Sequence, residues 1–199
     1  MENNSERKMY SEFPYALIIQ GDKMEKLDII EGKQVRLRRI LIEDTRLIVE
    51  WRNNPRVSQM FVFREKFTTE MHLHWMETKV ASGQVIQYII EEKVSGKPIG
   101  SVYFSDVNHI YRSAEYGIFI GENEAVGKGY GSETAKLFID YAFKKLNFHR
   151  ISLRVLEENQ IAYKSYISAG FKKEGVFRDM VFLDGEYKNV VFMAIIESD

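Results

Sequence analysis

The stretch Val126-Gly127-Lys128-Gly129-Tyr130-Gly131-Ser132 decides the fold, because it joins a strand-like segment to a strongly amphipathic helical pattern. Its alternate glycines leave the backbone N–H groups unobstructed and permit left-handed conformations. A diphosphate can then approach the N-terminus of the following helix, where amide groups and the helix dipole favour anions. The spacing Gly-x-Gly-x-Gly fits neither a P-loop nor the Gly-x-Gly-x-x-Gly dinucleotide fingerprint. The sequence therefore predicts an anion-binding loop of another kind.

The stretch from Val126 to Gly131 resembles the coenzyme A pyrophosphate loop of the GNAT acetyltransferase superfamily, Gln/Arg-x-x-Gly-x-Gly/Ala. Val126 replaces the usual Gln or Arg, but its backbone N–H is retained. Downstream, Asn159 to Phe171 is similar to the family pattern Asn-x-x-Ala-x-x-x-Tyr-x-x-x-Gly-Phe at every fixed position. Arg36-Leu37-Arg38 and Gly175-Val176-Phe177-Arg178 resemble the RimJ/RimL-type branch of this superfamily.

The resemblance covers roughly residues 27–196 and implies a single-domain α+β fold, with a mixed, mostly antiparallel central sheet flanked by helices. We expect residues 24–199 to form the acetyltransferase domain, preceded by an N-terminal extension, residues 1–23, that is partly disordered or adds an edge strand. Period-two patterns predict strands at 34–40, 86–91, 99–107, 114–121 and 150–156, and a closing pair at 171–182 and 187–196 joined by Asp184-Gly185. Helical patterns lie at 42–52, 68–80, after the glycine loop, and at 160–169.

Composition agrees with one compact enzyme domain. The chain has 199 residues, 45% of them hydrophobic, and its 28 basic and 29 acidic residues give a net charge of −1, which disfavours a nucleic-acid partner. The absence of cysteine excludes disulfides and thiolate chemistry, and no apolar run is long enough to cross a membrane. We expect a cytoplasmic protein without membrane partners or a metal site. Whether it forms a dimer or larger homo-oligomer is left open.

Acetyl transfer from a thioester to an amine needs a neutral nucleophile and a proton for the departing thiolate. The resemblance implies that Tyr166 is the general acid, whereas the residue pattern alone would suggest a core tyrosine. Glu115 lies in the strand before the glycine loop, where relatives place a carboxylate base; a structural ion pair with an arginine is the alternative. His109 competes for the same role, although its segment has the composition of a loop.

The cofactor implied by the resemblance is acetyl-CoA. Its pyrophosphate is expected on the loop backbone, at Val126, Gly127, Lys128, Gly129, Tyr130, Gly131 and Ser132. The pantetheine arm should pair like an added strand with Ile118, Phe119 and Ile120, near Asn159, and place the thioester at Tyr166. Glu133 should point away from the anion, with which it would otherwise compete.

The acceptor amine is the least determined part. Trp51-Arg52-Asn53 resembles a segment of bacterial amino-sugar and nucleotide-sugar N-acetyltransferases, since an indole suits stacking on a sugar and Arg suits a diphosphate. A helix terminus with a packed Trp and a surface Arg is the alternative. Tyr103 and His109 complete the predicted acceptor residues. An amino sugar, free or nucleotide-linked, is therefore the first hypothesis.

Three other hypotheses stay open. Residues 108–115 and 185–189 resemble spermidine N-acetyltransferases, but a polycation site should contain carboxylates and the strand at 100–105 has none. Acetylation of a protein N-terminus would need an open groove. A non-catalytic acyl-CoA-binding module is disfavoured by the presence of both Tyr166 and Glu115.

Overall fold

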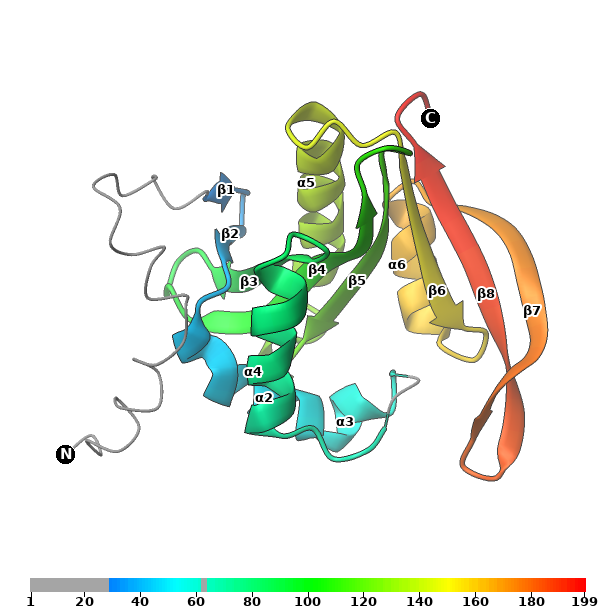
Figure 1. Ribbon diagram of the computed structural model, residues 1–199, viewed down its shortest axis with the longest axis horizontal. Coiled ribbons are helices and arrows are strands. Elements are labelled where there is room, and N and C mark those ends of the chain that lie inside the picture. The colour runs from blue at the N-terminus through cyan, green and yellow to red at the C-terminus, as the bar shows by residue number, and fades with distance from the viewer. Residues whose placement is uncertain (1–28, 62–63) are drawn as a thin grey trace.

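The structure is a computed structural model that describes residues 29–61 and 64–199. The extension predicted for residues 1–23 lies outside the described residues, so this domain boundary stays a prediction. Within the described part, one eight-stranded sheet has the order β1-β2-β3-β4-β5-β6-β8-β7, and helices cover both of its faces (Figure 1). No helix in these two ranges is long and apolar enough to span a membrane.

All neighbouring strands are antiparallel except β5 and β6, as the mostly antiparallel prediction required. The strands are β1 (Ile30–Glu31), β2 (Val35–Arg39), β3 (Ile86–Glu92), β4 (Pro98–Asn108), β5 (Ser113–Ile120), β6 (Arg150–Leu156), β7 (Lys172–Leu183) and β8 (Glu186–Ile196). The helical segments are η2 (Ile42–Asp44), α2 (Thr45–Asn53), α3 (Pro55–Ser58), α4 (Thr69–Trp75), η3 (Met76–Val80), η4 (Asn123–Ala125), α5 (Tyr130–Lys144) and α6 (Gln160–Ser168).

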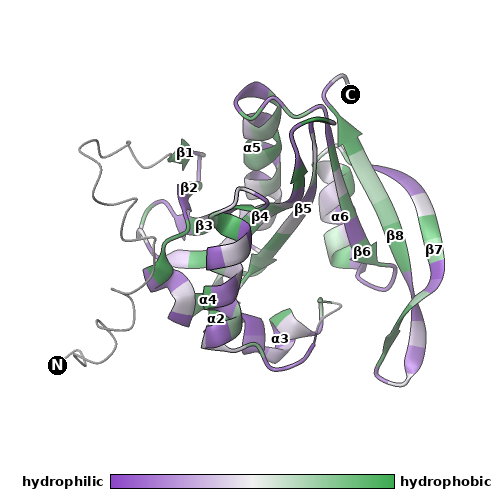
Figure 2. Cartoon of the chain, viewed as in Figure 1, coloured by the Kyte–Doolittle hydropathy of each residue, from purple (hydrophilic) through white to green (hydrophobic). Residues whose placement is uncertain are grey.

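Alternate residues of the strands fill two cores on opposite faces of the sheet. On the α5 and α6 face, Phe104 stacks on Phe138 with ring centroids 4.2 Å apart. On the α2 and α4 face, Ile89 and Phe119 pack with helix residues such as Trp51. Strand β8 lies between β6 and β7, and its C-terminal part, residues 190–196, is hydrophobic (Figure 2). Helix α5 packs on the sheet through residues such as Phe138 and Ile139.

The two parallel strands diverge early. β5 pairs with β6 only at Ser113↔Arg150, Ala114↔Ile151 and Glu115↔Ser152, and Figure 1 shows the strands separating beyond this point. Residues 116–120 keep β4 as a neighbour on one side only. Backbone groups on their other side are left without a ladder partner, so this edge can accept an extended ligand as a further strand.

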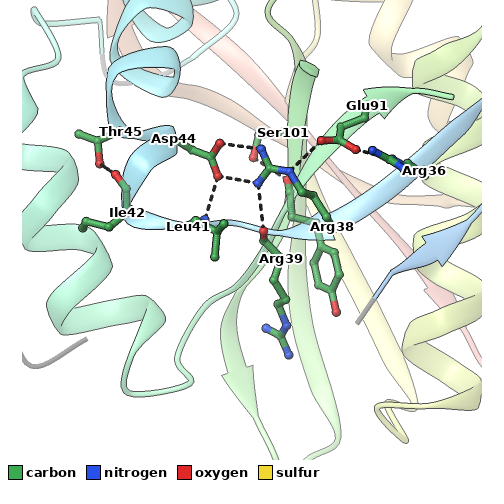
Figure 3. Close-up of polar contacts among 10 residues, drawn as sticks. Arg36, Arg38, Arg39, Leu41, Ile42, Asp44, Thr45, Glu91 and Ser101 are labelled. Atoms are coloured by element: carbon green, nitrogen blue, oxygen red, sulfur yellow. Dashed lines mark hydrogen bonds and ion pairs between the residues drawn. The ribbon is translucent and has the colours of Figure 1, made fainter. Parts of the chain in front are cut away.

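A buried ion network fixes α2 against the sheet (Figure 3). The Arg38 guanidinium donates to both carboxylate oxygens of Asp44, at 2.7 Å each, and its Nε donates to Glu91 at 2.8 Å. Asp44 also accepts the amide of Leu41 at 2.8 Å, at the entry to η2. These bonds raise the pKa of Arg38. Because β2, β3 and η2 meet here, the network sets where the end of α2 projects.

Candidate active site

The glycine loop has the backbone that its sequence predicts. Gly127 and Gly129 have φ of 77° and 84°, and Gly129 is the N-cap of α5. Among the described residues, none accepts a hydrogen bond from the amides of Gly127 to Ser132. A Cβ built on Gly127 or Gly129 meets nothing within 4 Å, and one on Gly131 only just reaches Ile120. A row of free donors thus faces open space at a helix N-terminus, which fits a pyrophosphate.

Side chains of the loop contribute little to this surface. Tyr130 is buried, and its hydroxyl donates to Glu92 at 2.5 Å, which anchors the start of α5 to the end of β3. Val126 and Lys128 are exposed. The loop therefore offers mainly its backbone, as predicted from the replacement at Val126.

Glu133 points away from the loop, as expected. Its carboxylate accepts the backbone amide of Gln34 at 2.8 Å and that residue's side-chain amide at 3.1 Å. Burial acts to raise the pKa of Glu133, but these hydrogen bonds outweigh it and lower the pKa. The Glu133 carboxylate binds the start of β2, so it does not compete with an anion on the loop.

Tyr166 lies beside the loop because α6 packs on α5. The hydroxyls of Ser165 and Ser132 are 3.1 Å apart, and the Tyr166 ring meets Tyr116 edge-to-face at 6.1 Å between centroids. Phe171 closes another side at 5.9 Å. Burial raises the pKa of Tyr166, so its phenol stays protonated at neutral pH. A protonated donor next to the diphosphate loop is the arrangement that a leaving thiolate needs.

Tyr116 was not singled out by the sequence. It is 4% exposed, and its hydroxyl has no hydrogen-bond partner in the described part of the chain. It projects from β5 next to Tyr166, where the two parallel strands separate. The sequence predicted a strand at 114–121, but no local signal marks the Tyr116 hydroxyl as unpartnered. This hydroxyl is a further polar group beside Tyr166.

Glu115 lies on the opposite face of β5 in an ion pair with Arg154. The Arg154 Nε is 3.0 Å from Oε1 and its Nη2 is 2.9 Å from Oε2, with both side chains partly exposed. The structural alternative stated for Glu115 is thus realised. The pair holds the carboxylate at the last position where β5 is still paired with β6, beside the point where the two strands part.

Tyr103 and Arg52 lie on that same face. A Cβ on Gly117 would lie 2.3 Å from the Tyr103 ring, so the glycine makes room for this tyrosine across the strands. The Arg52 guanidinium lies over Phe61, 3.4 Å from the ring centroid. Its Nε is buried without a hydrogen-bond partner among the described residues, and burial lowers the pKa of Arg52. A guanidinium kept without a carboxylate is available to an anionic ligand.

Three other predicted acceptor residues lie elsewhere. Trp51 is 3% exposed, fills the smaller core, and donates its indole N–H to Glu122 at 2.9 Å, so it has no face on which a sugar could stack. Asn53 accepts from the amide of Phe67 at 2.9 Å and thereby holds the loop before α4. His109 is exposed in the turn between β4 and β5, where β5 and β6 are still paired, rather than at their open end. The alternative stated for Trp51, a packed side chain at a helix terminus, is therefore the one that the structure shows.

The residues predicted to contact the pantetheine arm offer it some backbone groups and some side-chain groups. Phe119 is buried against Phe61 and Trp51, which leaves only its backbone for a ligand. The Ile120 carbonyl accepts from Arg56 at 2.9 Å, so this acceptor is already engaged. Asn159 is the N-cap of α6, and its Oδ1 accepts the amide of Ala162 at 3.2 Å. Its side-chain NH₂ group stays near the open end of the two strands.

Comparison with known proteins gives one family and a consistent set of relatives. Residues 34–172 match the family model described as an acetyltransferase (GNAT) domain. The chain is 32% identical over 163 residues to the spermidine N(1)-acetyltransferase of Escherichia coli (strain K12), which covers 82% of this chain and 86% of that protein. It is also 32% identical over 167 residues to the enzyme of that name from Vibrio cholerae, covering 84% and 95%.

Solved structures of similar proteins agree with this family assignment. The spermidine N-acetyltransferase from Vibrio cholerae in complex with CoA and spermine has a TM-score of 0.78 and 29% identity, and covers 83% of this chain and 96% of that chain. A dodecameric structure of that enzyme in an intermediate state has a TM-score of 0.72 and 30% identity, covering 83% and 95%. These matches support the superfamily resemblance without singling out its RimJ/RimL-type branch.

Proposed function

The chain belongs to the GNAT acetyltransferase family and is an acetyl-CoA-dependent N-acetyltransferase, and on this premise we propose that it acetylates a primary amine of a small polyamine such as spermidine. The observation that carries the proposal is the likeness, over 82–84% of this chain, to two spermidine N(1)-acetyltransferases. None of the relatives reported above is named for an amino sugar, so the first sequence hypothesis takes second place.

A polyamine carries several ammonium groups and needs carboxylates along its path. The strand at 100–105 has none, but a hollow of about 380 Å³ at the end of β6 is lined by Glu157, Glu158 and Asp179. Glu158 is 3.3 Å from the ammonium of Lys188, and Glu157 accepts from Asn189 at 2.8 Å, so these groups are partly engaged. The hollow lies at the open end of the divergent strands, where a distal ammonium of the acceptor would extend.

In the proposed reaction the acceptor amine attacks the thioester carbonyl directly. The amides of Gly127 to Ser132 hold the pyrophosphate, and the free edge of β5 aligns the pantetheine. Tyr166 donates a proton to the departing thiolate, and Glu115, through ordered water, takes the proton from the attacking ammonium. The proposal is supported by the free edge of β5, which begins directly after Glu115, the last residue of β5 that pairs with β6.

A second candidate acceptor is an amine that also carries a negative group, such as a nucleotide-linked amino sugar. It rests on Arg52, whose buried guanidinium near Tyr103 has no carboxylate partner within the described residues. A fixed cation there repels a polycation and attracts a phosphate. Trp51 no longer supports this candidate, because it is buried in the smaller core.

The deciding experiment measures thiol release from acetyl-CoA with spermidine, spermine, a free amino sugar, a nucleotide-linked amino sugar and an N-terminal peptide, using the wild type and Arg52→Gln. A polyamine enzyme should have its highest kcat/KM with spermidine, and Arg52→Gln should keep or raise that value. An anionic acceptor should instead lose roughly 10- to 100-fold with Arg52→Gln, since a charged hydrogen bond contributes about 1.5–3 kcal/mol. Cofactor binding without turnover on any amine would refute both candidates and favour a binding module.

The Vibrio cholerae relative is dodecameric in one structure. We propose that this chain also self-associates, without assigning the same number of copies.

A further inference from the structure

Strand β7 forms the outer edge of the sheet, and its middle departs from regular pairing. The ladder with β8 shifts between Phe177 and Val181, so that residues 178–180 have no partner in β8. Asp179 at the centre of this bulge has φ of 51°, and its amide donates to the side chain of Asn189 at 2.9 Å. The bulge is thus a fixed feature, and it projects Arg178, Asp179 and Met180 from the sheet edge.

The side chains on this bulge are exposed. Phe177 and Met180 are 47% and 44% exposed, which is high for large apolar residues. Between them, Arg178 and Asp179 are exposed and form no ion pair with any residue in the ranges 29–61 and 64–199. Two apolar groups therefore flank two adjacent opposite charges. Phe177 meets Phe192 edge-to-face at 5.9 Å between ring centroids but keeps nearly half of its surface exposed, and the two charges have no ion-pair partner among the described residues.

This order of residues is complementary to itself. If a second copy is placed antiparallel about a two-fold axis through the Arg178–Asp179 peptide, Arg178 faces the second copy's carboxylate at 179, and Phe177 faces its methionine at 180. The same two contacts recur on the other side of the axis, as an isologous interface requires. Binding to an unrelated partner would not require these four residues to be complementary to a second copy of themselves.

We infer that the β7 bulge, Phe177 to Met180, is a two-fold contact between copies of this chain. The inference rests on the proposed self-association and assigns a surface to it. It also places a second copy beside the acidic hollow, which Asp179 borders. A bulged edge does not extend the ladder indefinitely, so a closed contact is favoured over open strand addition.

The test is a charge-reversal cycle measured by sedimentation velocity, with no activity readout. Arg178→Asp puts acidic residues against each other across the axis, and Asp179→Arg does the same with basic residues. Each single variant should shift the protein to smaller species, with an association constant at least about tenfold lower. The double variant, and a one-to-one mixture of the two single variants, should recover the wild-type species.

Two further proteins keep the test decisive. Asp179→Asn removes the charge while keeping a residue that tolerates a positive φ, so it should weaken association without the strain of arginine; thermal melting confirms that each variant is folded. Lys136→Glu, an exposed change on α5, should leave the species unchanged. A monomeric wild type, single variants that keep the wild-type species, or a double variant that fails to recover it would overturn the inference. None of these outcomes depends on which amine is acetylated.

Discussion

At the scale of single residues, the environment of a side chain decides what its chemistry can be. Tyr166 keeps its proton because Tyr116 and Phe171 remove water from its phenol, which raises its pKa. Arg154 binds both oxygens of Glu115, which fixes the direction in which this carboxylate points. A protonated phenol on α6 and a carboxylate on β5 are suited to opposite proton transfers.

Tyr166→Phe should lower kcat by roughly 100-fold or more, the usual contribution of a positioned general acid. The affinity for CoA should change little, because we propose that the loop amides, not the phenol, hold the diphosphate. Steady-state kinetics and calorimetric CoA binding measure the two effects separately. Tyr163→Phe, one turn earlier on α6, is the matched control and should keep wild-type kcat. An unaltered kcat in Tyr166→Phe would remove this residue from the mechanism.

His72 predicts a loss of stability in acid. It is 1% exposed, its Nδ1 is 3.0 Å from the Thr45 hydroxyl, and its Nε2 has no hydrogen-bond partner in the described part of the chain. Burial lowers its pKa from 6.5 to about 4. The unfolded chain therefore binds this proton more tightly than the folded one. The stability associated with neutral His72 is complete above about pH 6.5 and falls as the pH drops toward 4.

The loss attributable to His72 should reach about 3 kcal/mol near pH 4, because each unit of pKa shift corresponds to about 1.36 kcal/mol. Urea unfolding at pH 7 and pH 4 measures this loss. His72→Leu should reduce the difference between the two pH values, whereas His74→Leu, at an exposed position on the same helix, should preserve it. Equal pH dependence in the wild type and His72→Leu would contradict the prediction.

At the scale of elements, the loop before α5 depends on glycine conformation. Gly129→Ala forces an L residue to φ of 84°, which costs roughly 1–2 kcal/mol, and the loop should relax away from its amide-exposing shape. CoA affinity should fall at least about tenfold, as calorimetry would measure. Gly83→Ala is the matched control, because Gly83 has φ of 74° and equally open surroundings, but lies in the turn before β3.

Gly83→Ala should lose comparable stability and keep wild-type CoA affinity. If the two alanine variants weaken CoA binding to the same extent, the effect is general strain rather than loss of the diphosphate site. The comparison therefore separates the role of a positive φ in folding from its role in binding.

The elements that the sequence predicted are those whose signals are local. Alternation located the β6 strand at Arg150–Leu156, and Asp184 and Gly185 adopt the positive φ values, 53° and 84°, that a two-residue hairpin favours. Thr68 caps α4 at the start of the predicted helical pattern, accepting the amide of Met71 at 3.3 Å. Local signals missed short elements that depend on contacts with the rest of the fold. These are the two-residue β1, the π-helical turn η3 and the one-turn α3.

The candidate site was predictable in its cofactor half and poorly predictable in its acceptor half. The proposed diphosphate loop depends on the positive φ of Gly127 and Gly129, and the glycine spacing encodes this conformation directly. The acceptor face is instead made by side chains from α2, β4, β5 and β6, and its character depends on pairings that no local pattern specifies. Glu115 forms an ion pair with Arg154, whereas Arg52 lies against the aromatic rings of Phe61 and Phe67. Those two outcomes decide the charge that an acceptor meets.

At the scale of the whole molecule, segments far apart in the sequence hold the acceptor side together. Arg64, in the loop between α3 and α4, donates to the Asp184 carboxylate at the tip of the β7–β8 hairpin. The same guanidinium donates to the carbonyls of Phe61 at 3.2 Å and Gln59 at 2.9 Å. Because Phe61 supports Arg52 at 3.4 Å, the hairpin tip is linked through Arg64 to the acceptor face.

Asp184→Asn should raise the KM for the acceptor by up to about fivefold, since a solvent-exposed ion pair contributes at most about 1 kcal/mol. Asn keeps the positive φ that the turn requires, so the hairpin should stay folded. The CoA affinity should not change, because the diphosphate loop has no contact with this pair. Raising the salt concentration should shrink the difference from the wild type, because ions screen the exposed carboxylate.

Glu186→Gln, which removes another exposed carboxylate from the same hairpin, is the control and should leave the acceptor KM unaltered. Its carboxylate pairs with Lys188 within the hairpin and does not reach the α3–α4 loop. If both substitutions raised KM equally, the cause would be the net charge of the hairpin acting on the acceptor. If only Asp184→Asn did so, the contact itself would be responsible, and an interaction at the sheet's outer edge would be shaping a pocket built on α2.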